Sequence, residues 1–234
     1  MKIIEPSVTV LTRINPDFLI PIERAGRTCY KSEQEYTRET AAKFVRMLLG
    51  RGHESVLEHV TVSARFVIDR GVSHELVRHR IASFSQESTR YCNYAKDKFG
   101  NELTFIKPWF FNKCGKAACM CGECMKYALW EESMDHVEVS YMHLIEAGAK
   151  PEEARSVLPN SLKTEIVVTA NLREWRHFFR LRTAKAAHPQ MRQIARPLLD
   201  ALKCTAAEAV FEDIEAYTGD LPHPWPAANV TFEV

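Results

Sequence analysis

A mixed α/β fold is the class that this sequence predicts, because strand-like and helix-like stretches alternate along its 234 residues. Residues 60–68 alternate apolar with polar side chains, which is the period of a half-buried strand. Residues 123–147 carry apolar side chains at helical spacing instead. Residues 163–170 are rich in β-branched side chains, and Asn171 with Glu174 forms an N-cap pair that opens the next helix.

The other elements follow from breakers and periodicity along the chain. In order, we expect an edge strand at 1–13, helices at 17–30 and 39–49, a short helix at 72–79, a loop at 83–93, a strand at 103–111, a short helix at 151–157, and helices at 171–181 and 189–211. Gly50 and Gly52 stop the helix at 39–49, and Pro151 suits the first position of a helix. No repeat or long linker divides the chain, so we predict a single domain over residues 1–234.

The composition is that of an ordinary globular protein. Hydrophobic residues make up 46% and charged residues 26% of the chain, which allows a sizeable core and argues against disorder. A formal net charge of +1 gives no reason to expect nucleic acid as a partner. The start of the chain is too polar for a signal peptide, and no apolar run reaches the roughly 20 residues of a membrane span. We therefore expect a cytoplasmic protein without membrane contact, whose seven cysteines are thiols or metal ligands.

Charge is nevertheless uneven along the chain. Between residues 171 and 196, seven basic side chains stand against the single acid Glu174. A run of this kind suits a polyanionic small ligand or a subunit interface, and a solvated basic face is the plain alternative.

The stretch 78–91 is the most informative part of the sequence. Its three arginines and one histidine are followed or flanked by the hydroxyl pair Ser88 and Thr89 on a polar loop: Arg78, His79, Arg80, Ser88, Thr89 and Arg90. Arginine pairs bidentately with phosphate, and hydroxyls and loop amides add further donors. Glu75 lies one helical turn before Arg78 and His79, so the three can share a face. The pattern predicts an anion-binding loop, whereas an isolated Arg-His-Arg would more simply be an exposed basic turn.

The full spacing, from Arg78 to Ser88, resembles the RHR-x7-S signature of the flavin-dependent thymidylate synthases. Three further segments resemble family segments in the same order: His-Glu-Ser-Val-Leu-Glu-His at 53–59, Ala-Arg-Ser-Val-Leu-Pro at 154–159, and Thr-Ala-Asn-Leu-Arg at 169–173 with Leu-Arg at 181–182. The resemblance implies a central mixed sheet flanked by long helices and an enzyme that reductively methylates dUMP to dTMP. It also implies FAD as cofactor, methylenetetrahydrofolate and NADPH as co-substrates, and a homotetramer with active sites shared between chains.

The resemblance further implies a role for each matching residue. Positions that match flavin contacts are Ser55, Arg78, His79, Arg80, Gln86, Asn171, Arg173 and His177. Positions that match dUMP contacts are Glu75, Arg78, Gln86, Glu87, Ser88, Thr89, Arg90, Arg155 and Arg182. Among these, Arg90 and Arg155 are expected on the phosphate. Arg182 matches an arginine at the uracil N3 edge, where a fixed cation would stabilise developing negative charge, and it is the expected catalytic residue.

Two departures from the family pattern matter. Family members often carry Asn-Glu where this chain has Ser85 and Gln86, with Glu87 one residue later. We therefore expect Gln86 to be a hydrogen-bonding ligand contact and not an acid or a base. The stretch 183–188 is also longer than in some members, and His188 is either a pocket residue or a packing residue.

Two common signatures are absent from the sequence. No GxGxxG fingerprint is present, so a flavin would be held by arginines, amides and hydroxyls and not by a Rossmann unit. No Pro-Cys-His segment marks a nucleophilic cysteine, and Cys92 lies outside the signature. The expected chemistry needs no enzyme nucleophile, since the cofactor carries the redox step and the protein supplies orientation and charge.

Two rival classes stay open at this point. The first is a zinc-scaffold interaction protein, because a segment near 112–125 that we interpret as an insertion holds a cluster that could close a tetrahedral site: Cys114, Cys119, Cys121 and Cys124. Reduced loop thiols, with no metal, are the expected state of this cluster. The second rival is a nucleotide- or RNA-binding module on the basic helices, where Trp175, Phe178 and Phe179 would stack on bases. Their spacing instead suits a buried helix face.

Overall fold

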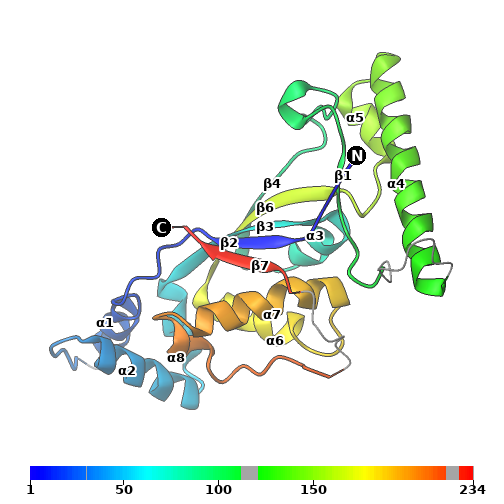
Figure 1. Cartoon of the computed structure of the whole chain (residues 1–234). Coiled ribbons are helices and arrows are strands. Elements are labelled where there is room, and N and C mark those ends of the chain that lie inside the picture. Colours follow the sequence, from blue (N-terminus) through cyan, green and yellow to red (C-terminus); the bar gives the residue numbers. More distant parts are fainter. Residues whose placement is uncertain (30, 112–120, 220–226, 234) are drawn as a thin grey trace. The chain divides into compact units, whose positions relative to one another are not determined.

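The computed structural model of the protein describes residues 1–29, 31–111, 121–219 and 227–233 (Figure 1). A five-stranded sheet has the strand order β4 (Ala82–Gln86), β6 (Lys163–Asn171), β3 (Thr61–Asp69), β2 (Ser7–Val10) and β7 (Asn229–Phe232). A two-stranded sheet pairs β1 (Lys2–Ile4) with β5 (Thr104–Ile106) in parallel. The helices are α1 (Ile20–Thr28), α2 (Arg38–Gly50), α3 (Arg70–Leu76), α4 (Gly122–Glu146), α5 (Pro151–Ala154), α6 (Leu172–Arg182), α7 (Pro189–Lys203) and α8 (Glu208–Phe211), with 3-10 turns η1 (Glu54–His59), η2 (Asp97–Phe99) and η3 (Arg155–Val157). The predicted mixed α/β class is confirmed.

The chain divides into two compact units. Unit 1 comprises residues 1–6, 67–76 and 86–166, and unit 2 comprises residues 7–66, 77–85 and 167–234. The boundary falls within β3, β4 and β6, so each of these strands contributes residues to both units. Each unit is therefore assembled from segments that lie far apart in the sequence.

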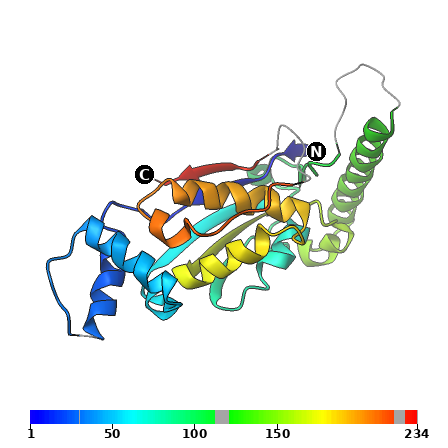
Figure 2. The ribbon, with the colours of Figure 1, turned by 90° about the horizontal axis from the view of Figure 1, so that it is seen from below.

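In unit 2, helices pack along the strands β2 and β7. Helix α7 lies against both strands, and α6 and α8 pack beside α7 (Figures 1 and 2). Helices α1 and α2 pack on each other, α1 also on η1 and α2 also on α8. Trp175 of α6 is buried against Phe66 and Phe179, and its indole Nε1 donates to the Val62 carbonyl at 3.0 Å. This packing holds α6, which carries many of the predicted site residues, rigidly within the unit.

In unit 1, the long helix α4 provides much of the core. It buries Tyr127, Trp130 and Tyr141 in a cluster that also contains Phe105 of β5. Helix α4 packs against α5 and η3 (Figure 1). This contact fixes the position of η3, the turn that begins at Arg155.

The strongly periodic elements are confirmed. The strands expected at 60–68 and 163–170 are β3 and β6, and the helices expected at 39–49 and 123–147 are α2 and α4. In the part of the chain that the structure describes, none of the helices combines the length and the apolar character needed to cross a membrane.

The predicted edge strand at 1–13 is wrong in two respects. The segment forms two strands, β1 and β2, and Pro6 lies between them, where its missing N–H interrupts a ladder. Strand β2 is not an edge strand, because β7 pairs with it in parallel, with Ser7 opposite Asn229 and Val10 opposite Phe232. Strand β7 itself was not predicted.

Three other predicted elements differ in extent. The loop expected at 83–93 begins as strand β4, whose side chains alternate between half-buried and exposed, as suits a strand at the end of the sheet order. The strand expected at 103–111 is limited to β5. The helix expected at 72–79 is α3, which ends at Leu76.

The long helix expected at 189–211 is interrupted after α7. The Thr205 hydroxyl donates to the Leu202 carbonyl at 2.7 Å and accepts from the Ala207 backbone N–H at 3.2 Å. A side chain that satisfies backbone groups in this way competes with the helical ladder. The chain therefore turns here before it enters α8.

Candidate active site

A polar pocket of about 470 Å³ opens at the start of α6 in unit 2. Its walls combine acidic, basic and amide side chains: Glu54, Glu58, Ile81, Asn171, Arg173, Glu174, His177 and Arg180. Asn171 caps α6, since its Oδ1 accepts from the Glu174 backbone N–H at 2.8 Å, and this confirms the predicted N-cap. The positive end of the α6 dipole therefore lies at the pocket and favours an anionic ligand there.

Three of the predicted flavin contacts line this pocket, namely Asn171, Arg173 and His177. Arg173 and His177 lie four residues apart on α6, and both side chains are exposed, so they project from the same face of the helix. Ser55 is exposed on η1, the turn that forms another wall of the pocket. The structure thus brings together residues that the sequence placed more than 100 positions apart.

Arg78 and Arg80 are exposed on the turn between α3 and β4, whereas His79 between them is buried. Because α3 already ends at Leu76, Glu75 does not share a helical face with Arg78 and His79. That part of the prediction is wrong. The turn instead directs the two arginines to solvent and the histidine to the interior.

The basic run on α6 is balanced by acids from other parts of unit 2. Arg173 pairs with Glu58 at 2.6 Å. Arg176 is 1% exposed and pairs with Asp213 at 2.6 Å and with Glu54 at 3.3 Å. The count of basic residues in the sequence therefore overstates the positive charge at this site. Arg176 has a structural role, because it joins α6 to two acids while it is sealed from solvent.

His79 lies at the centre of a hydrogen-bond chain. Its Nδ1 is 2.9 Å from Oε1 of Glu174, and its Nε2 is 3.1 Å from Nε of Arg182. Since an arginine offers only donors, Nε2 must be the acceptor, and we assign the proton to Nδ1, which donates to the carboxylate. Burial lowers the pKa of His79, the Glu174 hydrogen bond opposes this shift, and the charge of Arg182 adds to it. The imidazole is therefore neutral at neutral pH.

The ligand atoms of His79, Glu174 and His177 lie within 4.8 Å of one another, a spacing that a metal ion could bridge. However, Arg182 places a permanent cation 3.1 Å from the imidazole, and Coulomb repulsion opposes a second cation. We therefore interpret these residues as a hydrogen-bonded cluster and not as a metal centre.

In unit 1, the loop after β4 is held by its own side chains. The Glu87 carboxylate accepts from the Tyr94 hydroxyl and from the Lys163 ammonium, both at 2.9 Å. The Ser88 carbonyl accepts from the Cys92 backbone N–H at 2.9 Å and closes a turn. Glu87 thus anchors the loop. A contact of its carboxylate with dUMP would require these partners to be exchanged.

Gln86 is likewise anchored. Its Nε2 donates to the Ser73 hydroxyl at 2.9 Å and to the Thr164 hydroxyl at 3.2 Å, and both of these residues are fully buried. A ligand contact by Gln86 would therefore use its carbonyl oxygen or its backbone. Of the other predicted dUMP contacts in unit 1, Thr89 is buried and Glu75 is half-buried.

Arg90 and Arg155, the predicted phosphate residues, lie on neighbouring segments of unit 1. Arg90 is 3.7 Å from the Glu152 carboxylate of α5, and Arg155 follows α5 at the start of η3. Both arginine side chains are exposed. The Arg90 guanidinium also lies 5.4 Å from the ring centroid of Tyr91. Two exposed guanidinium groups on adjacent segments suit a phosphate.

The predicted contacts divide between the units. All predicted flavin contacts except Gln86 lie in unit 2. All predicted dUMP contacts except Arg78 and Arg182 lie in unit 1. Sequence reasoning missed two acidic wall residues of the pocket, Glu54 and Glu58, although both lie in the motif segment at 53–59.

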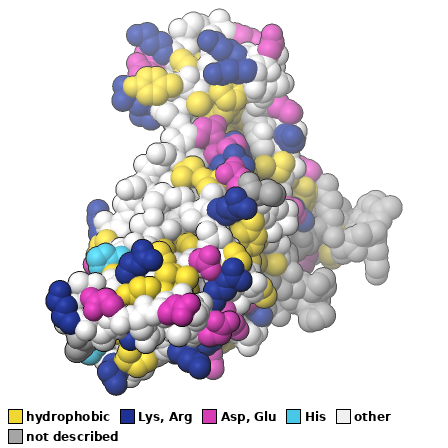
Figure 3. All heavy atoms as spheres, turned by 90° about the vertical axis from the view of Figure 1, so that its left-hand side faces the viewer, with side chains coloured by type: hydrophobic (Ala, Val, Ile, Leu, Met, Phe, Trp, Pro, Cys, Tyr) yellow, Lys and Arg dark blue, Asp and Glu magenta, His cyan; other side chains and the backbone are white. Residues whose placement is uncertain are grey.

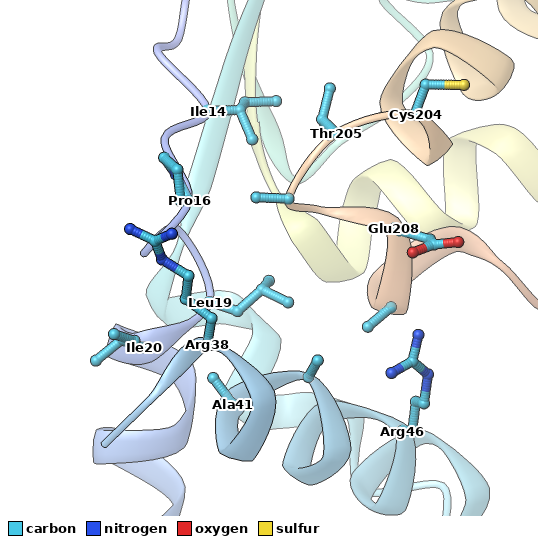
Figure 4. A pocket seen from close by; sticks show the side chains of 13 residues that line it. Ile14, Pro16, Leu19, Ile20, Arg38, Ala41, Arg46, Cys204, Thr205 and Glu208 are labelled. Carbon is cyan, nitrogen blue, oxygen red and sulfur yellow. The ribbon is translucent and has the colours of Figure 1, made fainter. Parts of the chain in front are cut away.

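A larger pocket of about 540 Å³ also lies in unit 2, among α1, α2 and the turn before α8 (Figure 4). Its lining is mainly apolar, and its two arginines are already paired, Arg38 with Asp17 and Arg46 with Glu212, both at 2.8 Å. Figure 4 shows Arg46 beside Glu208 at one end. The described residues that line it include none of the predicted contacts, so the smaller, polar pocket is the better candidate.

Two residues of uncertain role receive structural assignments. His188 caps α7, since its Nδ1 accepts from the Gln190 backbone N–H at 3.3 Å, and it is exposed. Burial raises the pKa of the Cys92 thiol, with the nearby charge of Glu87 acting in the same direction. Cys92 is therefore protonated at neutral pH and poorly suited as a nucleophile.

The cysteine cluster behind the zinc alternative is only partly described by the structure. Cys114 and Cys119 lie outside the described residues, while Cys121 is exposed before α4 and Cys124 is half-buried in its first turn. The expected reduced thiols stay a prediction, and zinc stays the alternative to them.

For the nucleic-acid rival, the three aromatic residues of α6 are 3% exposed or less and cannot stack on bases: Trp175, Phe178 and Phe179. The face drawn in Figure 3 carries basic and acidic side chains interspersed with hydrophobic ones, and its described side chains form no continuous basic surface.

Comparison with known proteins gives consistent matches. A family model described as thymidylate synthase complementing protein matches residues 10–206. A flavin-dependent thymidylate synthase of Geobacter sulfurreducens is 33% identical over 228 residues, which cover 94% of this chain and 91% of that protein. The protein of the same name from Pyrococcus furiosus is 36% identical over 178 residues, which cover 75% of this chain and 68% of that protein.

A solved structure shares the fold. The crystal structure of the UMP/dUMP methylase PolB from Streptomyces cacaoi bound with 5-Br dUMP matches with a TM-score of 0.72 and 19% sequence identity. The match covers 91% of this chain and 97% of that chain. The arrangement of helices and strands described above is therefore one already seen by crystallography.

Proposed function

The chain belongs to the flavin-dependent thymidylate synthase family, and we propose on that premise that it methylates dUMP to dTMP with methylenetetrahydrofolate as carbon donor and NADPH as reductant. The observation that carries the proposal is the polar pocket at the start of α6, which is lined by three residues at positions that match flavin contacts of the family, Asn171, Arg173 and His177. Its setting suits an anionic cofactor.

The residues of this pocket fit FAD. The flavin cofactor carries a pyrophosphate, and the pocket offers a helix N-terminus, the guanidinium groups of Arg173 and Arg180, and the imidazole of His177. The salt bridge between Arg173 and Glu58 is exposed, so exchanging the carboxylate for a phosphate costs little. We propose that Ser55, with the exposed arginines of the 78–80 turn, completes the set. When bound and reduced, FAD supplies the hydride that converts the transferred carbon into a methyl group.

Unit 1 supplies the proposed dUMP contacts. Arg90 and Arg155 would pair with the phosphate, and the turn closed by Ser88 would offer backbone and hydroxyl donors. Glu87 and Gln86 hold this turn in place through the buried contacts described above. Their proposed contribution to binding is thus partly indirect.

Arg182 has the proposed catalytic role. Its guanidinium is charged at any working pH, so it neither gives nor takes a proton. It would instead lower the free energy of negative charge on the uracil ring as C5 becomes nucleophilic. The protonated thiol of Cys92 fits the same scheme, because no covalent enzyme–dUMP bond is then required.

Two further properties belong to the proposal. We propose a homotetramer whose active sites draw on more than one chain, and the cytoplasm as the compartment. Light scattering of the purified protein tests the assembly, and a monomer that turns over dUMP at full rate would contradict it.

One experiment tests the function as a whole. The purified protein should be yellow from bound flavin, and anaerobic NADPH should bleach it. dTMP should then form only when both dUMP and methylenetetrahydrofolate are present. A colourless protein that cannot be loaded with FAD, or dTMP formation without flavin, would overturn the proposal. A covalent dUMP adduct on Cys92 would overturn the mechanism.

A further inference from the structure

The hydrogen-bond chain of Glu174, His79 and Arg182 lies wholly within unit 2. Glu174 lies in the first turn of α6 and Arg182 in the last. Eight residues of helix span roughly 12 Å, so the two side chains are too far apart to meet directly. The imidazole of His79, which enters from the turn before β4, bridges this gap.

We propose that Glu174 and His79 are positioning residues that fix the orientation of the Arg182 guanidinium. The inference rests on the proposed function, because it assumes that Arg182 acts on the pyrimidine. Neither residue needs to touch dUMP for this role. Glu174 acts through the imidazole, and the imidazole acts through Nε of Arg182.

The physical basis is the tautomer of His79. The Glu174 carboxylate accepts from Nδ1–H at 2.9 Å and thereby keeps the lone pair on Nε2, which accepts from Arg182 at 3.1 Å. Without the carboxylate, the proton could move to Nε2 and would then face the N–H of Arg182 as a second donor. The side chains of His79 and Glu174 are 5% and 9% exposed, so water cannot readily replace either partner.

The charged and titratable groups that contribute most to the pKa shift of His79 come from one helix. Glu174, His177 and Arg182 all lie on α6, and the ring of Phe178 packs against the imidazole with centroids 5.1 Å apart. These contacts with α6 hold the imidazole at one orientation. The arrangement resembles the way a carboxylate orients a histidine in other sites, where removing the outer partner lowers activity about 10–100-fold.

The test is a double-mutant cycle in the FAD-loaded full-length protein. Glu174→Leu should lower kcat roughly 10–100-fold with little change in KM for dUMP. Glu174→Gln, which keeps an acceptor for Nδ1–H, should retain most of the activity. In an Arg182→Ala background, Glu174→Leu should have no further effect, because its only route to the reaction has been removed.

Glu58 provides the matched control. It is another carboxylate of the same pocket, but it pairs with Arg173 and not with His79. The effects of Glu58→Leu and Arg182→Ala on kcat/KM should therefore multiply independently. If the effect of Glu174→Leu on kcat/KM also multiplies independently with that of Arg182→Ala, the positioning role is wrong and Glu174 acts on the flavin pocket itself.

A pH profile keeps the idea testable if Glu174→Leu does not fold. Protonation of His79 would remove the acceptor for Arg182, so kcat should fall in acid with the pKa of His79. The Glu174 hydrogen bond raises that pKa, and Glu174→Gln should therefore move the acid limb to lower pH. An acid limb that does not move would overturn the inference. A wild-type protein that forms no dTMP would instead overturn the proposed function, which is a different result.

Discussion

The two units prepare their predicted ligand contacts in different ways. In unit 2, the predicted flavin contacts Asn171, Arg173 and His177 line a formed pocket on a single helix. In unit 1, Gln86 and Glu87 turn their polar groups inward to hold a loop, and Arg90 and Arg155 remain exposed beside it.

This difference shows that a sequence motif mixes two kinds of residue. Some members are placed to meet a ligand, and others build the loop or helix that presents them. Residues of the second kind are bonded within the protein before any ligand arrives, as Glu87 is to Tyr94 and Lys163. A motif match alone therefore cannot say which member binds.

The largest expected effect is on catalysis by Arg182, whose buried partner His79 belongs to unit 2. Arg182→Ala should lower kcat roughly 10²–10³-fold, the scale seen when one preorganised charge-stabilising group is lost. Bound flavin, measured by absorbance, should be nearly unchanged. Arg182→Lys should restore only part of the rate, because an ammonium cannot reproduce the planar guanidinium. A near-normal kcat in Arg182→Ala at saturating dUMP would mean that Arg182 has a structural role and not a catalytic one.

The next effect concerns the phosphate contacts of unit 1. Arg90→Ala or Arg155→Ala should weaken dUMP binding by about 2–3 kcal/mol, because each loses a charge-assisted contact. Titration calorimetry with dUMP measures this, and flavin affinity should stay the same. Lys126→Ala removes another exposed cation of unit 1, paired only locally with Glu123 at 2.8 Å, and serves as the control. Equal losses of flavin and dUMP affinity would contradict the assignment of the dUMP contacts to unit 1 and of the flavin contacts to unit 2.

A smaller effect is expected for the exposed flavin contact. Arg173→Ala should weaken FAD binding by roughly 1 kcal/mol, since its guanidinium is half exposed and already shared with Glu58. Fluorescence quenching of free FAD measures the affinity. Arg180→Ala, on the same helix and in the same pocket but outside the family motif, should have the weaker effect of the two. If Arg180→Ala weakened FAD binding more than Arg173→Ala, the flavin contact would be assigned to Arg180 instead.

The smallest expected effect is on stability, because unit 2 should be destabilised in acid and unit 1 in alkali. The pKa of His79 is lowered, chiefly by burial. Unit 2 should therefore keep its full free energy of unfolding above about pH 6.5, the ordinary pKa of histidine, and lose part of it as pH falls. Burial raises the pKa of Tyr127 to about 12, so unit 1 loses stability as pH rises above about 10. Between about pH 10 and 11 the loss of stability from Tyr127 should be on the order of 1 kcal/mol, since one pKa unit corresponds to about 1.4 kcal/mol.

Urea unfolding of single-tryptophan variants resolves the two units. Trp175 reports on unit 2 and Trp130 on unit 1. Tyr127→Phe should remove part of the alkaline loss seen through Trp130 and leave the acid loss seen through Trp175. Identical pH profiles for both reporters would mean that the units unfold as one.

Sequence reasoning succeeded where local pattern and local chemistry agree. Strand β3 alternates along its whole length, and Asn171 caps α6 through a contact only three residues away. It failed where pairing partners are distant. Strand β4 has polar side chains that read as a loop, and only its place beside β6 makes it a strand. Strand β7 is short and exposed, so nothing local marks it.

The site shows the same division. Arg173 and His177 stand four residues apart in the helix expected at 171–181, and both line the pocket. The partners of the basic run could not be predicted, because Glu54, Glu58 and Asp213 reach α6 only through the packing of η1 and of the segment after α8. The bridge from Glu174 to Arg182 depends on a histidine about 100 residues away in the sequence.

The pairing of β2 with β7 has a consequence for biosynthesis. Residues 229–232 leave the ribosome more than 200 residues after residues 7–10. During that interval β2 presents an open hydrogen-bonding edge that another nascent chain could occupy. The pairing of β2 with β7 forms only after β7 is released, so completion of unit 2 should be late and sensitive to chaperone supply. A stop codon placed just before β7 should leave much of α6 and α7 intact, yet send the product to aggregates.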